Sequence, residues 1–108
     1  MSVEIIISPS AKADIRDIYE YISFELAVPH AAKRITNQIL NRISLLRDNP
    51  EMFPIYPEEP LYSKEIRFFP VEKYLVFYKF NKNKVKVGRI IYGGRSIPKQ
   101  ITNTIDFE

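Results

Sequence analysis

Three apolar runs in the second half of the chain constrain its fold more than any other feature. They cover residues 63–69, 74–80 and 84–92. Pro70 follows the first run, a polar link at residues 81–83 joins the second to the third, and Gly93-Gly94 follows the third. Aromatic and β-branched residues bounded by Pro, Asn and Gly are typical of strands, and a short polar link is typical of a hairpin. We therefore predict three successive strands, of which the last two form a hairpin.

The last of these runs places an arginine among apolar side chains. On one face it has Val85, Val87, Arg89 and Ile91, and on the other Lys86, Gly88, Ile90 and Tyr92. Regular alternation puts Arg89 beside Val87 and Ile91, where an unpaired charge is costly. Arg89 is therefore expected either to form a salt bridge within the fold or to line a concave partner site, and the sequence leaves both open.

Two amphipathic helices are expected before these strands. Residues 3–7 (VEIII) predict a first strand covered on both faces, and Ser8-Pro9 is a helix start, since Ser caps free amides and Pro suits the first turn. The first helix is expected over residues 9–26, with an apolar stripe of Ala11, Ile15, Ile18, Tyr19, Ile22 and Leu26. The second starts near Pro29, ends at residues 48–50 and buries Ala32, Ile35, Ile39, Ile43 and Leu46. Together they predict an antiparallel helical hairpin.

The resulting order, β-α-α-β-β-β, indicates an α+β fold in which the helical hairpin packs on a small, mostly antiparallel sheet. Residues 51–62 contain three prolines and are expected to form a loop. In a chain of 108 residues we expect one domain over residues 1–98, followed by a weakly ordered tail over residues 99–108.

Positive charge gathers in the predicted sheet. Residues 64–100 hold ten Lys or Arg against two acids, a net charge of +8, whereas residues 1–63 hold six basic and nine acidic residues. This asymmetry indicates an acidic partner, either nucleic acid or protein. The chain has no Cys, no signal-peptide pattern and no apolar stretch of the roughly 20 residues that span a bilayer. We expect a cytoplasmic protein that does not meet membranes.

Few residues suggest catalysis. His30 is the single histidine, and without a Cys, His or carboxylate cluster it is a poor metal or triad candidate. The acids of the first helix lie off its apolar stripe and are expected on a solvated face; they are Asp14, Asp17, Glu20 and Glu25. We expect neither a metal nor a cofactor.

Aromatic and basic residues share the predicted strands. Tyrosines interleaved with Lys and Arg can stack single-stranded bases, but aromatic side chains in strands are also ordinary core packing, which we favour for any single tyrosine. Arg95 follows two glycines at a strand end, where it is placed to contact phosphate or carboxylate.

Several segments together resemble the RelE/ParE superfamily of bacterial toxins. These are AKADIRDIYEYI (residues 11–22), LLRDNP (45–50), RFFPVEKYLVFY (67–78) and RIIYGGRSIP (89–98). The resemblance covers almost the whole chain up to Pro98. It implies two helices against a small antiparallel sheet, and the toxin of a type II toxin–antitoxin pair, a class associated with plasmid stabilisation.

The superfamily has two main branches. The RelE-like branch is a metal-independent endoribonuclease that cleaves messenger RNA in the ribosome with basic and acid–base residues on its sheet. The strand positions at which that branch carries lysines and an arginine hold Ser63, Glu65 and Leu75 here, and no Tyr or His follows Arg95. The YLVFY and GGRSIP segments look like the ParE branch, which inhibits DNA gyrase by binding. We therefore expect a ParE-like, non-enzymatic toxin, with the ribosome-dependent nuclease as the alternative.

The resemblance also implies partners and contact residues. The toxin is expected to form a heterotetramer with a cognate antitoxin, through which alone it meets promoter DNA. Contacts to the target are expected from Arg67, Arg89, Tyr92 and Arg95. Contacts to the antitoxin are expected from Tyr74, Tyr78, Lys86 and Ile97. Were the chain a nuclease, its site would be Arg67, Tyr78 and Arg95. A third reading is a non-toxic remnant or a nucleic-acid binding module of the same fold.

Overall fold

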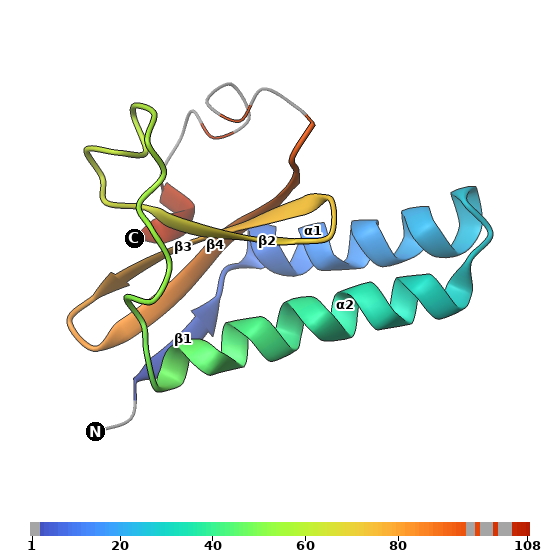
Figure 1. Cartoon of the computed structure of the whole chain (residues 1–108), viewed down its shortest axis with the longest axis horizontal. Helices are drawn as coiled ribbons and strands as arrows, with labels where there is room; N and C mark the ends of the chain where they lie inside the picture. Colours follow the sequence, from blue (N-terminus) through green and yellow to red (C-terminus); the bar gives the residue numbers. More distant parts are fainter. Residues whose placement is uncertain (1–2, 95–96, 98–100, 102–104) are drawn as a thin grey trace.

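The computed structural model describes residues 3–94, 97, 101 and 105–108. Two helices form a hairpin that packs on one face of a four-stranded sheet (Figure 1). The elements are β1 (Glu4–Ile7), α1 (Pro9–Glu20), a π-helical turn η1 (Tyr21–Glu25), α2 (Pro29–Ser44), a 3-10 turn η2 (Leu45–Arg47), β2 (Arg67–Val71), β3 (Tyr74–Asn81), β4 (Lys84–Tyr92) and a 3-10 turn η3 (Ile105–Phe107). The predicted α+β class and the order β-α-α-β-β-β are confirmed.

The sheet has the strand order β1-β4-β3-β2. β2, β3 and β4 are antiparallel neighbours, and β1 pairs parallel with the first half of β4. β1 is thus an edge strand, with Glu4 exposed and Ile5 to Ile7 half-buried. Side chains on both faces of β1 are therefore only partly covered, which is less than the expected burial.

The predicted start of the first helix is confirmed. The Ser8 hydroxyl accepts a hydrogen bond from the Ala11 amide at 3.0 Å, and Pro9 occupies the first turn. The same hydroxyl donates to the Gly88 carbonyl at 2.8 Å, while the Ser8 amide donates to the Val87 carbonyl at 2.9 Å. One serine therefore both caps α1 and joins it to β4.

The end of the first helix differs from the prediction. α1 stops at Glu20, and the chain continues through η1. A π-helical turn holds an extra residue and so changes which side chains face inward: Ile22 is buried, whereas Leu26 is exposed. Tyr19 was also expected on the apolar stripe but is exposed, since it lies at the margin of that stripe.

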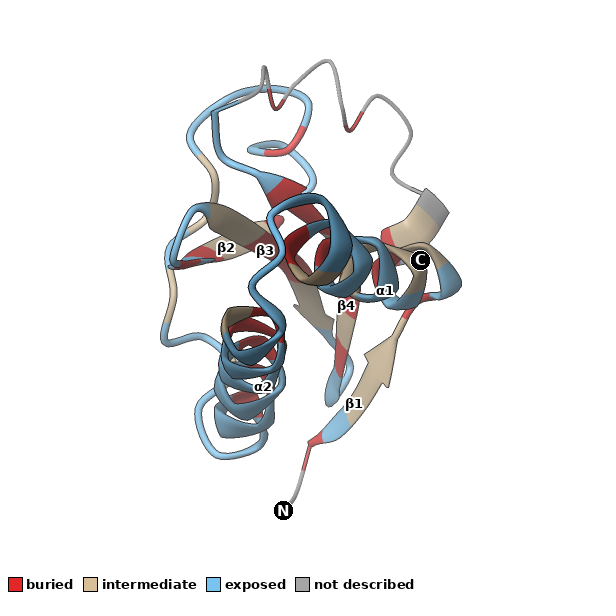
Figure 2. Cartoon of the chain, turned by 90° about the vertical axis from the view of Figure 1, so that its right-hand side faces the viewer, coloured by how far each residue is buried: buried red, intermediate tan, exposed pale blue. Residues whose placement is uncertain are grey.

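The helices bury one face each against the sheet. The predicted inner face of the second helix is confirmed, since its residues are all buried: Ala32, Ile35, Ile39 and Ile43 in α2 and Leu46 in η2. They form one cluster with Ala11, Ile18 and Ile22 and with the sheet residues Phe69, Val76, Tyr78, Val85, Val87 and Ile90. Figure 2 shows this pattern, with buried residues turned toward the sheet and exposed ones toward solvent.

The first strand after the loop lies later than predicted. β2 begins at Arg67 and includes Pro70, while residues 61–65 form turns. Ser63 and Glu65 are therefore not strand residues. Pro70 is tolerated because β2 is an edge strand, where a missing N–H on the outer side costs no ladder bond.

A β-bulge interrupts β4. Tyr78 pairs with Val87 and Phe77 pairs with Arg89, so that Gly88 is an extra residue on β4. A bulge shifts the alternation of the side chains that follow it. Val87 accordingly lies in the helix-facing cluster, whereas Ile91 lies in a second cluster. The predicted face containing both Val87 and Ile91 is wrong for this reason.

The second cluster covers the sheet face opposite the helices. Its buried members are Leu61, Ile66, Phe77, Ile91, Ile97, Ile101 and Phe107. A Cβ at Gly88 would lie 2.4 Å from the Phe107 ring, so the glycine leaves the space that Phe107 fills. Half of the tail that we expected to be weakly ordered, residues 99, 100 and 102–104, lies outside the described residues. Within it, Ile101 and Phe107 are buried.

No helix in the described part of the chain combines the length and apolar character needed to cross a membrane.

Candidate functional site

Arg89 forms a two-point ion pair with Asp14 of α1. Its Nε lies 2.8 Å from Oδ2 and its Nη2 lies 3.2 Å from Oδ1. The exposed fractions of the two side chains are 27% and 15%. The Asp14 hydrogen bond raises the pKa of the guanidinium, although burial opposes this. Of the two alternatives for Arg89, the structure thus contains the salt bridge within the fold, and its contact with a target stays a prediction.

Asp14 also completes the edge of β4. β1 pairs with β4 only as far as Val87, and beyond that point Ser8 binds the Gly88 carbonyl while Asp14 Oδ2 accepts from the Ile90 amide at 2.9 Å. The expectation that Asp14 lies on a solvated face is therefore wrong. No helical period reveals it, because its partners are 75 and 76 residues away in sequence.

Arg67 and Tyr78 hold the loop that follows the second helix. The two residues pair across β2 and β3. The Tyr78 hydroxyl donates to the Pro50 carbonyl at 2.8 Å, and Arg67 Nη1 donates to the Phe53 carbonyl at 2.7 Å. Arg67 also lies 3.3 Å from the Glu51 carboxylate. These contacts fix the path of the loop along the outer edge of the sheet.

This arrangement bears on the residues predicted for a nuclease site. Tyr78 is fully buried, and burial raises its pKa to about 12 although Arg67 opposes the shift. A buried phenol with such a pKa keeps its proton near neutrality and has no access to substrate. Arg67 is held by the loop, and Arg95 lies outside the described residues. The structure thus brings Arg67 and Tyr78 together, but as a support for the loop.

Two tyrosines meet at the end of β4. The rings of Tyr74 and Tyr92 pack edge to face with centroids 6.1 Å apart. Tyr92 is 44% exposed and Tyr74 is half-buried. Burial, together with Tyr21 and Tyr92 nearby, raises the pKa of Tyr74. Among the other predicted contact residues, Ile97 is buried and Lys86 is half-buried.

The turn between the helices carries exposed apolar residues, of which the sequence pattern predicted a role for Leu26 alone, as an inward-facing residue. They are Tyr21, Phe24, Leu26 and Val28, of which Phe24 is 76% exposed. This end of the helical hairpin extends beyond the sheet (Figure 1). The π-helical turn is what directs Leu26 outward, and the sequence pattern held no signal for it.

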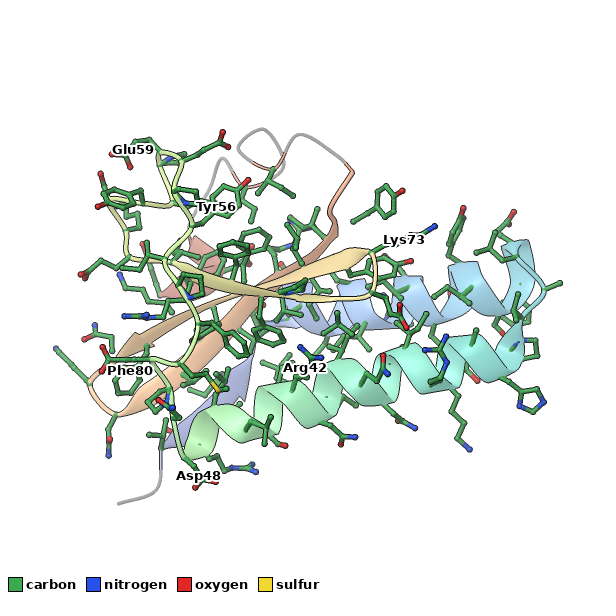
Figure 3. All side chains as sticks on the ribbon, in the orientation of Figure 1. Arg42, Asp48, Tyr56, Glu59, Lys73 and Phe80 are labelled. Carbon is green, nitrogen blue, oxygen red and sulfur yellow. The ribbon has the colours of Figure 1, made fainter. Side chains whose placement is uncertain are left out.

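Lysines gather at the opposite end of the sheet, around the β3–β4 turn. Figure 3 marks the two ends of the strands: Lys73 lies at the end nearer the turn between the helices, and Phe80 lies at the end nearer the β3–β4 turn. A groove of about 520 Å³ is lined by Ile6, Lys79, Asn81, Lys82, Lys84, Lys86, Phe107 and Glu108. The sequence shows the charge, but the groove also depends on Phe107 packing back over Gly88.

Within the described residues, no three His, Cys, Asp or Glu side chains gather in a way that would hold a metal ion. His30 is exposed at the start of α2, as expected for a surface residue.

These features define the class of the molecule: a small, basic α+β protein whose sheet carries an apolar cluster on the face opposite its helices. A family model described as the ParE toxin of the type II toxin–antitoxin system parDE matches residues 5–97. The chain therefore belongs to the ParE toxin family, and the expected superfamily and branch are confirmed.

A solved structure supports the fold. A chain from the "Chromosomal ParDE TA system from P. aeruginosa" is 18% identical, with a TM-score of 0.68 over 83% of this chain and 95% of that chain. At this identity the likeness concerns the fold alone. A search of curated proteins gave no match.

Proposed function

We propose that this chain is the toxin of a type II toxin–antitoxin module, that it inhibits DNA gyrase in the cytoplasm by binding, and that a cognate antitoxin neutralises it within a heterotetramer. The family supplies the toxin role. The burial of Tyr78 is the observation that favours binding over cleavage, because the one tyrosine of the predicted nuclease site is held by the Pro50 carbonyl.

The character of the sheet also supports a binding function. Leu75 packs beside the second apolar cluster, at a position where the nuclease branch is expected to carry an arginine. A ribonuclease needs groups that exchange a proton and cations that stabilise a phosphorane-like transition state. On the face opposite the helices, Phe77, Ile91 and Phe107 are instead buried in the second apolar cluster.

Tyr92 is the predicted target contact with the most accessible side chain among the described ones. An exposed tyrosine beside a second aromatic ring is a common anchor at protein interfaces. We propose that the Tyr74–Tyr92 pair contributes to the protein–protein contact, and that Arg89 acts indirectly by holding β4 against α1.

A supercoiling assay with purified gyrase and plasmid tests this function. The wild-type chain is expected to block supercoiling, Tyr92→Ala is expected to weaken inhibition roughly tenfold as an interface anchor does, and Tyr62→Ala, which removes another exposed tyrosine, is expected to inhibit like the wild type. Unchanged supercoiling at a large molar excess of folded toxin would contradict the gyrase target.

The nuclease alternative is tested by primer extension on messenger RNA from cells that express the chain. Cuts in the messenger RNA that are in phase with its codons would show that the chain acts by cleavage and not by binding gyrase. Induced expression with and without the adjacent reading frame tests toxicity itself. Growth arrest that the neighbouring gene relieves would support a toxin–antitoxin module. Unimpaired growth would indicate that the chain is a non-toxic remnant with the same fold.

A further inference from the structure

The lysines of the β3–β4 hairpin form one continuous basic groove. Four of them, Lys79, Lys82, Lys84 and Lys86, line the groove of about 520 Å³. Lys64 and Lys79 line an adjoining hollow together with Phe107. The hairpin brings these residues together, since Asn81 pairs with Lys84 and Lys79 pairs with Lys86.

The charges in this groove are poorly balanced by the fold itself. Lys79 and Lys86 stand directly opposite each other, an arrangement in which like charges destabilise a sheet. Among the described residues Lys84 has a carboxylate within 4.0 Å, that of Glu4 at 3.8 Å, whereas the Lys79 and Lys82 ammonium groups have none. Lys86 donates to the main-chain oxygen of Glu108. Glu108 is the one acidic residue in the groove lining, so a net positive charge remains.

The chemistry of the lining narrows the ligand class. β2 pairs with β3 only as far as Tyr78, so the end of the hairpin extends past β2, with β1 as the outer neighbour of β4. The one aromatic side chain in the groove lining, Phe107, is buried, so the groove offers no ring on which single-stranded bases could stack. Its lysines are strongly hydrated point charges that suit phosphates without requiring a fixed orientation.

The groove offers little to a protein partner. Protein interfaces depend on apolar anchors that fill pockets, but Phe107 is buried under its own contact with Gly88 and Ile6 is half-buried. A phosphate backbone needs cations alone, because its binding energy comes largely from the release of counterions. We propose that the β3–β4 hairpin binds the phosphate backbone of duplex DNA directly, without sequence specificity. The proposed DNA binding does not depend on which protein the toxin inhibits. It differs from the expectation that the chain contacts DNA only through its antitoxin.

Fluorescence anisotropy with the full chain and a labelled duplex of about 20 base pairs tests the proposal without gyrase or antitoxin, so its failure is distinguishable from failure of the gyrase target. We expect a Kd of about 10 µM at low salt that weakens steeply as KCl rises. The triple variant Lys79→Gln, Lys82→Gln, Lys86→Gln should bind at least about tenfold more weakly, and the slope of log affinity against log salt concentration should be smaller by about 3.

A matched variant separates the groove from net charge. Lys12→Gln, Lys33→Gln, Lys73→Gln removes the same charge from α1, α2 and the β2–β3 turn and should change affinity by less than about twofold, since these lysines do not line the groove. Equal losses in the two triple variants, each shown to be folded by circular dichroism, would overturn the site.

Two further arms address the ligand. Glu108→Gln removes the acidic side chain from the groove and should tighten DNA binding about twofold to threefold. A poly-glutamate peptide of equal charge is expected to compete weakly. If that peptide binds the groove more tightly than the duplex does, the ligand is an acidic polypeptide and the proposal is wrong.

Discussion

At the scale of single residues, Asp14 has two structural roles. It neutralises Arg89 and accepts the Ile90 amide beyond the end of β1. Removing a partly buried carboxylate leaves a guanidinium and an amide without their acceptors, and such losses cost more than the pair itself contributes. The ion pair is therefore a requirement of the fold.

Replacing Asp14 should reveal this requirement. Asp14→Asn is expected to lower the free energy of unfolding by about 2 kcal/mol, measured by urea denaturation. The control is Asp17→Asn on the same helix, where the side chain is 70% exposed and the expected change is below about 0.5 kcal/mol. Equal effects of the two substitutions would show that Asp14 acts as a surface residue.

Tyr78 predicts a pH dependence at the alkaline end. Its folded pKa of about 12 exceeds the unfolded value of 10.0, so its contribution to stability is complete below pH 10 and is lost as pH rises toward 12. Raised pKa values at Tyr56 and Tyr74 act in the same direction. Denaturation across this range should show falling stability, with a total loss from Tyr78 of up to about 3 kcal/mol.

The Tyr78→Phe variant isolates that contribution. It should cost about 1 kcal/mol at neutral pH, because the Pro50 carbonyl loses its donor, and should show a shallower decline above pH 10. Tyr62→Phe, which changes an exposed tyrosine, should leave the profile as in the wild type. A decline that is identical in Tyr78→Phe would assign the pH dependence to other groups.

At the scale of elements, two irregularities separate what the sequence predicts from what it does not. The inner face of α2 and the limits of β4 follow from periodicity and turn residues, and both match the structure. Periodicity and turn residues do not predict the π-helical turn or the bulge at Gly88, because each inserts one residue at a position that depends on packing against distant segments. A glycine inside a strand is a recognised bulge signal, so the shift at Gly88 was partly readable, whereas η1 was not.

The bulge predicts a coupled pair of substitutions. Gly88→Ala should destabilise the chain by about 1 to 3 kcal/mol, since the new methyl group would meet the Phe107 ring 2.4 Å away. In a Phe107→Ala background the same change should cost much less. A double-mutant cycle by thermal or urea unfolding measures this coupling, and additive effects would show that the contact does not limit the fold.

At the scale of the whole molecule, one sheet joins two apolar clusters. Val76 and Tyr78 lie in the helix-facing cluster, while Phe77 between them lies in the other. If β3 were displaced, the buried side chains of both clusters would become exposed together. The candidate contact surface was less predictable than the fold, because Tyr78 and Ile97 are buried by segments distant in sequence.

Shared strands predict a single cooperative transition. Urea unfolding followed by far-ultraviolet circular dichroism, which reports mainly on α1 and α2, should coincide with unfolding followed by tyrosine fluorescence, to which Tyr74, Tyr78 and Tyr92 of the sheet contribute. Two separated transitions would mean that the cluster containing Phe107 unfolds independently of the helical side.

The pairing of β1 with β4 has a consequence for how the toxin is made. Glu4 lies beside Lys84, eighty positions later in the chain. A growing polypeptide exposes its first strand early and must wait until residues 84–87 of β4 have emerged before that strand has a neighbour. The sheet therefore cannot close before β4 has been made, and an interrupted polypeptide that stops before residue 84 leaves β1 without its strand partner.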